Sequence, residues 1–392
     1  MSQQLIDHSS DLKRLQDEGY EIEIQSGYLL AHHIPYVNSA RQIAFGTLVS
    51  ELALSSNFST AAPNNHVIYF QGDHPCDKNG AMIAAISHAT QNQMLFPNFV
   101  VNHSFSNKPP NGYPDYYQKI KTYSDIISAP AKSIDSNVTE KTFRVIISEE
   151  NESVFKYIDS NSTRSSILPI SQKLISERIA IVGLGGTGSY ILDFIAKCPV
   201  KEIHLFDGDD FLQHNAFRSP GAASIDVLNQ HLKKVEYFKQ VYSNMHKAIV
   251  AHTTFIENEN LDLLKGMTCV FLSIDRGSTR KKIIEFLLLQ GTRIIDVGIG
   301  VEKVNDSLIG TLRVTSLDEI KRDHVGKRIP LNDDPNEAYN SNIQIAELNC
   351  LNATLAVIKW KKWVGFYNDL EHEYHTTYSI NVSQLLNDEI GL

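Results

Sequence analysis

The second half of the chain alternates short apolar runs with segments in which apolar residues recur every three or four positions. Short apolar runs are typical of buried strands, and the three-to-four spacing is typical of amphipathic helices. The predicted strands are Arg178–Gly183, Glu202–Phe206, Ile249–Phe255, Cys269–Ile274 and Arg293–Val297, and the predicted helices are Ser189–Lys197, Lys233–Ser243, Asn260–Leu264 and Thr279–Gln290. This order predicts an α/β fold with a Rossmann-like, doubly wound, mostly parallel sheet and helices on both faces.

A longer helix is expected near the end of the chain, at Ile343–Gly365, after a loop-like stretch over 316–340. Its apolar residues recur at helical spacing, which predicts a stripe packed on the core. The members of this stripe are Ile345, Leu348, Leu351, Leu355 and Ile358.

The first half has a different pattern, with strand-like runs separated by Pro, Gly and Asn turns. We expect strands at Tyr20–Val37, Gln42–Leu52, Val67–Phe70 and Asn98–Val101, a helix at Tyr116–Ser128, a hairpin of Phe143–Ile147 with Ser153–Ile158, and a helix at Thr163–Leu174 interrupted by Pro169. A separate N-terminal α+β domain over 1–160 and a second domain over 161–392 are therefore predicted.

The amino-acid composition argues against a nucleic-acid partner and against a membrane-spanning segment. The 392 residues are 42% hydrophobic and 21% charged, as in folded globular proteins, and their number favours two domains. Because 45 acidic residues outnumber 36 basic ones, giving a formal charge of -9, nucleic acid is not an expected partner. No run approaches the roughly 18 apolar residues that span a bilayer, and the start of the chain is polar, so a cytoplasmic protein without a membrane segment is expected.

The four cysteines are scattered and form no CxxC pair, so neither a disulfide framework nor a paired-thiolate zinc site is indicated. Cys198 and Cys269 are expected to be buried packing residues, and Cys350 to pack on the long helix. If a thiol takes part in the chemistry, Cys76 or Cys350 is the expected nucleophile, because a reactive thiolate must be accessible.

A glycine-rich turn links the first predicted strand of the α/β region to its helix. Gly183, Gly185, Gly186 and Gly188 allow a tight turn and the close approach of a phosphate to the helix N-terminus. Their spacing also satisfies GxGxxG, and Asp207 follows where a dinucleotide enzyme has its ribose-binding carboxylate. An NAD-dependent oxidoreductase is therefore one alternative.

A second set of residues follows the next strand. Asp207, Asp209, Phe211, Asn215 and Arg218 keep a fixed spacing, and Lys233, Lys234, Asp275 and Arg280 come later. This set resembles the ThiF/MoeB/E1 family of ATP-dependent adenylyltransferases, over about Ser171 to Gly365. It is far more specific than the glycines.

The resemblance implies a role for each residue. Asp207, supported by Asp209, would hold the ATP ribose, while Asn215, Arg218 and a lysine would hold the phosphates and Asp275 would hold Mg2+. Lys234 is favoured over Lys233 because the family order Lys-hydrophobic-Glu is repeated in Lys234–Glu236. Arg164, before the first strand, would reach the ATP of the partner subunit in a homodimer.

Each of these residues has a simpler alternative. Asp207 and Asp209 would cap the turn after a strand, and Asp275 would cap the helix that begins near Thr279. Arg218 and Arg164 would be surface arginines.

The N-terminal region resembles an uncharacterised module that is fused to such enzymes in bacteria, beside genes for ubiquitin-like proteins. The resembling segments are Ile34–Val37, Asn65–Cys76 and His103–Tyr116. A zinc site of His66, His74, Cys76 and His103 is one hypothesis, and turn and core roles are the other.

The resemblance as a whole predicts an E1-like enzyme that adenylates the C-terminal carboxylate of a ubiquitin-like protein or peptide with ATP and Mg2+ and releases pyrophosphate. Cations there would offset the repulsion between the carboxylate and the α-phosphate. An E2-like conjugation partner is a further expectation. The alternatives are activation of a sulfur carrier or peptide-antibiotic precursor, the NAD-dependent oxidoreductase, and a non-catalytic nucleotide-binding scaffold.

Overall fold

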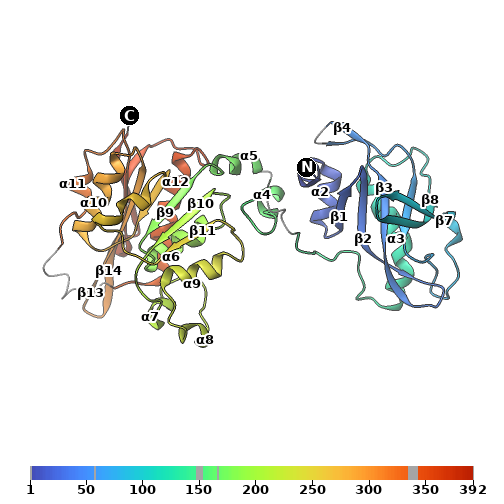
Figure 1. Cartoon of the computed structure of the whole chain (residues 1–392), viewed down its shortest axis with the longest axis horizontal. Coiled ribbons are helices and arrows are strands. Elements are labelled where there is room, and N and C mark those ends of the chain that lie inside the picture. Colours follow the sequence, from blue (N-terminus) through green and yellow to red (C-terminus); the bar gives the residue numbers. More distant parts are fainter. Residues whose placement is uncertain (1, 57–58, 147–152, 166, 334–342, 392) are drawn as a thin grey trace. The chain divides into compact units, whose positions relative to one another are not determined.

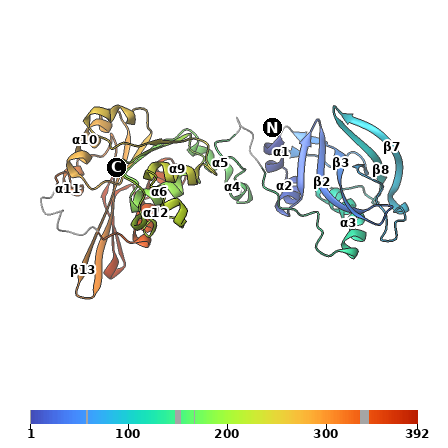
Figure 2. The same ribbon diagram turned by 60° about the horizontal axis from the view of Figure 1, so that its bottom comes forward.

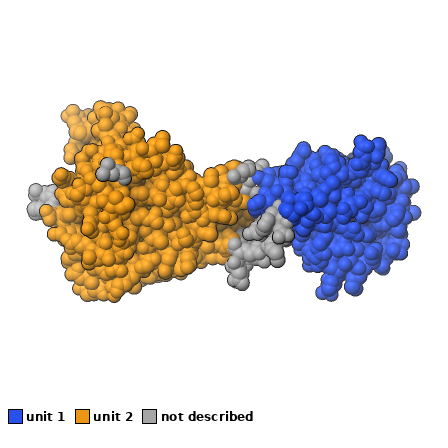
Figure 3. All heavy atoms as spheres, turned by 90° about the horizontal axis from the view of Figure 1, so that it is seen from above, with its two compact units in different colours: residues 1–146 blue, residues 147–392 orange. Residues whose placement is uncertain are grey.

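The computed structural model describes residues 2–56, 59–146, 153–165, 167–333 and 343–391. The chain forms two compact units, Met1–Ile146 and Ile147–Leu392, which Figure 3 colours separately. The domain boundary near residue 160 stays a prediction; it falls at the start of α4 in the second unit.

The first unit is an antiparallel sheet with helices, so the expected separate α+β domain is confirmed (Figure 1). Its elements are α1 (Ser2–His8), α2 (Ser10–Asp17), β1 (Glu21–Gln25), β2 (Tyr28–Val37), β3 (Ile43–Glu51), β4 (Leu54–Ser56), β5 (Ser59–Thr60), β6 (Val67–Gln71), η1 (Ala84–Ile86), β7 (Ser87–Phe96), β8 (Phe99–Ser106) and α3 (Tyr116–Ile134). The six-stranded sheet has the order β1-β2-β3-β6-β8-β7. Helix α3 begins at the cap of Asp115, whose side chain accepts from Gln118 N (2.7 Å), and it buries one face against the sheet.

The second unit contains an eight-stranded sheet of order β11-β10-β9-β12-β13-β14-β15-β16. Its elements are α4 (Ser160–Arg164), α5 (Leu168–Ser171), η2 (Gln172–Leu174), β9 (Arg178–Val182), α6 (Gly186–Ile195), β10 (Glu202–Phe206), α7 (Gln213–Ala216), α8 (Ile225–Leu228), α9 (Lys234–Tyr242), β11 (Ile249–His252), η3 (Asn258–Leu264), β12 (Cys269–Leu272), α10 (Gly277–Leu288), β13 (Arg293–Val304), β14 (Ser307–Leu317), α11 (Val325–Arg328), α12 (Ala346–Trp363), β15 (Glu373–Ser379), η4 (Ile380–Val382) and β16 (Gln384–Ile390). The first five strands in this order, from β11 through β10, β9 and β12 to β13, are parallel. The strands that follow, β14, β15 and β16, each pair antiparallel with the strand before them. The predicted Rossmann-like, parallel-rich fold is confirmed.

Alternate residues of the parallel strands point to opposite faces, and both faces are covered. On β9, Ile179 and Ile181 pack in one core with α6, α9 and α12, whereas Ala180 and Val182 pack in the other with η3 and α10. This two-sided burial explains why these strands appear in the sequence as nearly continuous apolar runs.

Several predicted elements differ in the structure. The expected hairpin at 143–158 is wrong in its described part: 143–146 and 153–158 contain no strand, and Phe155 only forms an isolated bridge with His246. Residue 147 of this hairpin lies outside the described residues. The helix expected over 163–174 is divided into α4, α5 and η2, with Pro169 in the first turn of α5, where proline is tolerated.

The sequence missed the antiparallel end of the sheet. Strand β13 continues past the predicted end at Val297 to Val304 and forms with β14 a long ribbon, visible in Figure 2. The exposed strands β7 and β16 were not predicted either, because polar side chains on both faces remove the alternation that marks a half-buried strand.

The buried face of α12 is not the predicted apolar stripe. The stripe residues are only partly buried, and Ile358 is exposed. The face that packs on α6 and the sheet instead carries Asn349, Asn352, Ala353, Ala356 and Trp360. Small side chains let α12 approach closely. Asn352 Nδ2 donates to Gly298 O (3.2 Å), while its buried Oδ1 has no hydrogen-bond partner among the described residues.

Within the described residues, no helix has the length and apolar character needed to cross a membrane.

Candidate functional site

The glycine turn lies at the carboxyl end of β9, the central parallel strand. Gly183 has a φ of +88°, and a Cβ on it would lie 2.3 Å from the carbonyl oxygen of Ser273. A Cβ on Gly188 would lie 1.9 Å from the carbonyl oxygen of Gly183. A side chain at either position would clash with the backbone, so only glycine fits. The turn thereby brings the start of α6 against the end of β9.

The other two glycines face different surroundings. A Cβ on Gly186 would lie 2.0 Å from Asn349 Nδ2, so this glycine makes room for α12. Among the residues that the structure describes, no atom lies within 4 Å of where a Cβ of Gly185, the N-cap of α6, would be, and no side chain caps the helix there. The amide groups at the start of α6 thus have an open side at which an anion fits.

Asp207 lies at the end of β10 and is buried. Its Oδ2 accepts from Leu184 N (2.7 Å) in the glycine turn, and its Oδ1 accepts from Asp209 N (2.8 Å). The turn-capping alternative is therefore confirmed for Asp207. It does not compete with ribose binding, because each carboxylate oxygen can accept a second hydrogen bond.

The two adjacent lysines have different partners. Lys234 Nζ lies 2.7 Å from Asp209 Oδ2 and 3.5 Å from Asp207 Oδ2, and its side chain is 8% exposed. Lys233 pairs with Asp210 (2.7 Å), and its side chain is 40% exposed. The structure thus brings Lys234, the favoured lysine, to the carboxylates, while its phosphate role remains a prediction.

Asn215 and Arg218 lie on the segment after β10. Asn215 is buried, and its side-chain oxygen accepts from Leu212 N (2.9 Å) at the start of α7. Arg218 Nε is buried and has no hydrogen-bond partner within the described residues. Burial lowers the pKa of Arg218, and the nearby Asp209 opposes that shift. A buried guanidinium nitrogen without an acceptor fits a phosphate oxygen.

Asp275 follows β12 and is exposed, and no residue that the structure describes pairs with its carboxylate. The helix-cap alternative is wrong. Helix α10 begins at Gly277 with Arg276 as its N-cap, and the side chain of Asp333 accepts from Ser278 N (3.0 Å). Asp275 therefore presents its oxygens to solvent, and oxygens are the ligands that Mg2+ prefers.

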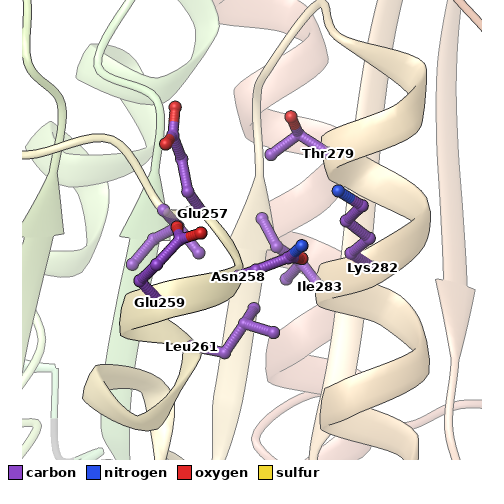
Figure 4. A pocket seen from close by; sticks show the side chains of 8 residues that line it. Glu257, Asn258, Glu259, Leu261, Thr279, Lys282 and Ile283 are labelled. Carbon is purple, nitrogen blue, oxygen red and sulfur yellow. The ribbon is translucent and has the colours of Figure 1, made fainter.

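A pocket of about 240 Å³ lies between the start of η3 and the first turns of α10. Figure 4 shows Asn258 and Leu261 facing Lys282 and Ile283 across it. The ring of Phe255, just before the pocket segment, lies 2.6 Å from where a Cβ of Gly208 would be. Phe255 therefore packs against the turn that carries Asp207, and the segment that follows Phe255 lines the pocket.

Arg164 is the last residue of α4, and its side chain lies outside the described part of the structure. Its predicted role across a dimer stays a prediction.

The cysteines are mostly buried. Cys198 and Cys269 are buried as expected, and burial raises the pKa of both thiols. The expectation that Cys76 is accessible is wrong: it is 1% exposed, its Sγ donates to His74 O (3.2 Å), and burial raises its pKa. Cys350 is half-buried on α12.

The zinc hypothesis finds no support in the first unit. The rings of His74 and His103 lie 4.9 Å apart, but the described residues contain no group of three or more metal-ligating side chains.

Sequence reasoning missed one buried residue at the centre of this site. Asn349 on α12 accepts from Thr187 Oγ1 (3.0 Å), and its Nδ2 donates to Arg218 O (3.4 Å). It thereby ties the glycine turn to the Arg218 segment. Two asparagines three residues apart inside a mostly apolar helix were the available signal.

Comparison with protein-family models gives one match in each half of the chain. Residues 160–303 match the ThiF family model, so this region is a ThiF-family domain. Residues 10–160 match DUF6791, a domain of unknown function. Comparison with curated proteins gave no match.

Similar solved structures include MccB of E. coli with ATP, at 17% identity and a TM-score of 0.45 over 57% of this chain and 66% of MccB. The chain thus spans just under two thirds of MccB. PaaA matches at 14% identity and a TM-score of 0.45, over 87% of this chain and 98% of PaaA. E. coli tRNA N6-threonylcarbamoyladenosine dehydratase, TcdA, matches at 16% identity and a TM-score of 0.39, over 53% of this chain and 93% of TcdA.

Proposed function

We propose that this protein uses ATP to adenylate the C-terminal carboxylate of a ubiquitin-like protein or peptide. The observation that carries the proposal is the set of groups at the carboxyl ends of β10, β9 and β12. Three of them are the buried pair of Lys234 and Asp207, the open start of α6, and Arg218 Nε, which has no hydrogen-bond partner among the described residues. The ThiF-family match over 160–303 supports the same activity.

Each group has a definite part in this reaction. Asp207 accepts from the ribose hydroxyls, the pocket between η3 and α10 receives the base, and the amides of α6, Lys234 and Arg218 bind the phosphates. The substrate carboxylate attacks the α-phosphorus, the bond to the bridging oxygen of the β-phosphate breaks, and pyrophosphate leaves with the electron pair. No proton has to be removed from the attacking carboxylate, so the site needs cations rather than a general base.

Asp275 is the residue that would hold Mg2+, since its carboxylate is exposed next to the glycine turn and has no partner among the described residues. When bound, Mg2+ supplies positive charge that offsets the repulsion between phosphate and carboxylate.

Calorimetry with ATP and with NAD, each with Mg2+, tests the nucleotide. We expect binding of ATP only, weakened in Arg218→Ala but not in Arg178→Ala. Arg178 is a matched control because it pairs with Glu202 (2.9 Å) at the start of β9, and the candidate site lies at the other end of this strand. Tight binding of NAD without a response to ATP would overturn the proposal.

We further propose that Arg164 acts across a homodimer, as the ThiF resemblance implies. Mixing Arg164→Ala chains with Arg218→Ala chains would then restore one competent site in each mixed dimer, measured as pyrophosphate exchange. Absence of rescue after verified subunit exchange would remove this role.

A further inference from the structure

Arg280 on α10 is a buried arginine to which the proposed reaction gives no part. It is 4% exposed, and its guanidinium has three partners on three different segments. Its Nη2 donates to Ile274 O, its Nη1 donates to Pro330 O (2.6 Å), and its Nε lies 2.8 Å from Asp296 Oδ1. The first of these partners is the residue directly before Asp275.

The orientation of Arg280 is fixed from the sheet. Asp296 on β13 is fully buried, and its second oxygen lies 2.6 Å from Arg313 Nη2 on β14. Arg313 in turn donates to Thr315 Oγ1 (2.9 Å). Two arginines on one buried carboxylate add little stability compared with apolar packing, but they hold the planar guanidinium in one direction.

The residues after Asp275 are held as well. The backbone of Asn332 lies so close to Gly277 that a Cβ there would be 2.4 Å from the Asn332 carbonyl oxygen. Asp333 accepts from Ser278 N (3.0 Å). Because Arg280 also binds Pro330 O, it anchors both the start of the Asp275 turn and the segment that covers its end.

We propose that Arg280 is a positioning residue that fixes the direction of the Asp275 carboxylate toward Mg2+. This inference rests on the proposed function. Asp275 has no partner of its own among the described residues, so its direction depends on the backbone, and Arg280 holds that backbone at Ile274. Loss of a group that orients a metal ligand typically weakens metal binding by about 10- to 100-fold.

The test is a calorimetric titration of ATP at increasing Mg2+ in the full-length protein. Arg280→Lys keeps the charge beside Asp296 but loses the fork that binds both carbonyl groups. We expect the Mg2+ concentration for half-maximal enhancement of ATP binding to rise by about 10-fold or more, with ATP binding in EDTA unchanged. Arg293→Lys is the matched control, because Arg293 pairs with Glu177 (3.2 Å) at the opposite edge of the sheet; we expect no change in the Mg2+ midpoint.

Asp296→Asn is a second variant in case Arg280→Lys does not fold, and we expect it to shift the Mg2+ midpoint in the same direction. A midpoint equal to that of the wild type in the folded variants would overturn the role of Arg280 and leave the proposed function standing. A wild-type protein that binds no ATP at any Mg2+ concentration would overturn both.

Discussion

Replacing Lys234 by Met, with Lys233→Met for comparison, tests which of the two adjacent lysines binds the ATP phosphates. Lys234 is held between Asp207 and Asp209, whereas Lys233 lies at the surface with Asp210. The pair of variants Lys234→Met and Lys233→Met therefore removes the same charge one residue apart, from a buried and from an exposed position.

The structure sets the size of the two effects on stability. Breaking a buried ion pair costs roughly 3–5 kcal/mol, but Asp207 keeps two backbone N–H donors and Asp209 is 57% exposed. We therefore expect Lys234→Met to lower the free energy of unfolding by about 2–3 kcal/mol. Lys233→Met should cause no detectable change, because solvent screens its pair.

ATP affinity is the second quantity. A charge-assisted hydrogen bond contributes roughly 1.5–3 kcal/mol, so Lys234→Met should raise the Kd for ATP by about 10- to 100-fold. Urea denaturation and calorimetry measure the two effects on the same samples. Equal ATP affinities of the folded Lys234→Met and Lys233→Met proteins would refute the assignment of Lys234.

Three further results are expected. Asp275→Ala should abolish substrate-dependent pyrophosphate exchange without changing the unfolding midpoint, because this carboxylate is exposed and has no partner among the described residues; exchange at the wild-type rate would contradict the metal assignment. Cys269→Ala should leave exchange intact while costing about 1–3 kcal/mol of stability, measured by denaturation, and loss of exchange in the folded variant would show that this thiol is needed. Burial lowers the pKa of His246 to about 4, so the unfolded chain binds a proton between pH 6.5 and 4 that the folded chain does not; stability should fall by about 3 kcal/mol over this window, and His246→Phe should flatten the fall in pH-dependent denaturation.

The parallel part of the fold could be predicted because burial on both faces produces uninterrupted apolar runs. Strand β10 begins and ends where the sequence places it, at Glu202 and Phe206. Strand β16 could not be found in this way, because its side chains are nearly all exposed and leave no pattern. Local pattern predicted the helix α12 but not its buried face, which depends on how closely α6 and the sheet approach it.

The candidate site was predictable where residues follow strands at fixed spacing. Asp207 and Asp275 are such residues, since the ends of adjacent parallel strands meet at one edge of the sheet. Asp296 and Asn349 act through contacts between segments far apart in the chain, which spacing does not reveal; Arg280 belongs to the spaced set, but spacing did not reveal its contacts with Pro330 and Asp296. Cys76 was misjudged for the same reason, because its burial depends on the loop folding back over it.

The bond that is cleaved in ATP tests the central claim most directly. The protein is incubated with ATP, Mg2+ and a candidate substrate, a ubiquitin-like protein with a free C-terminus, and nucleotides and acyl products are separated by chromatography and mass spectrometry. Adenylation predicts one pyrophosphate for each acyl-adenylate formed, and added hydroxylamine should displace AMP and convert the C-terminal acyl group of the substrate into a hydroxamate. The same substrate with an amidated C-terminus should give neither product. ADP and phosphate, or AMP formation that does not depend on the free carboxylate, would contradict the account.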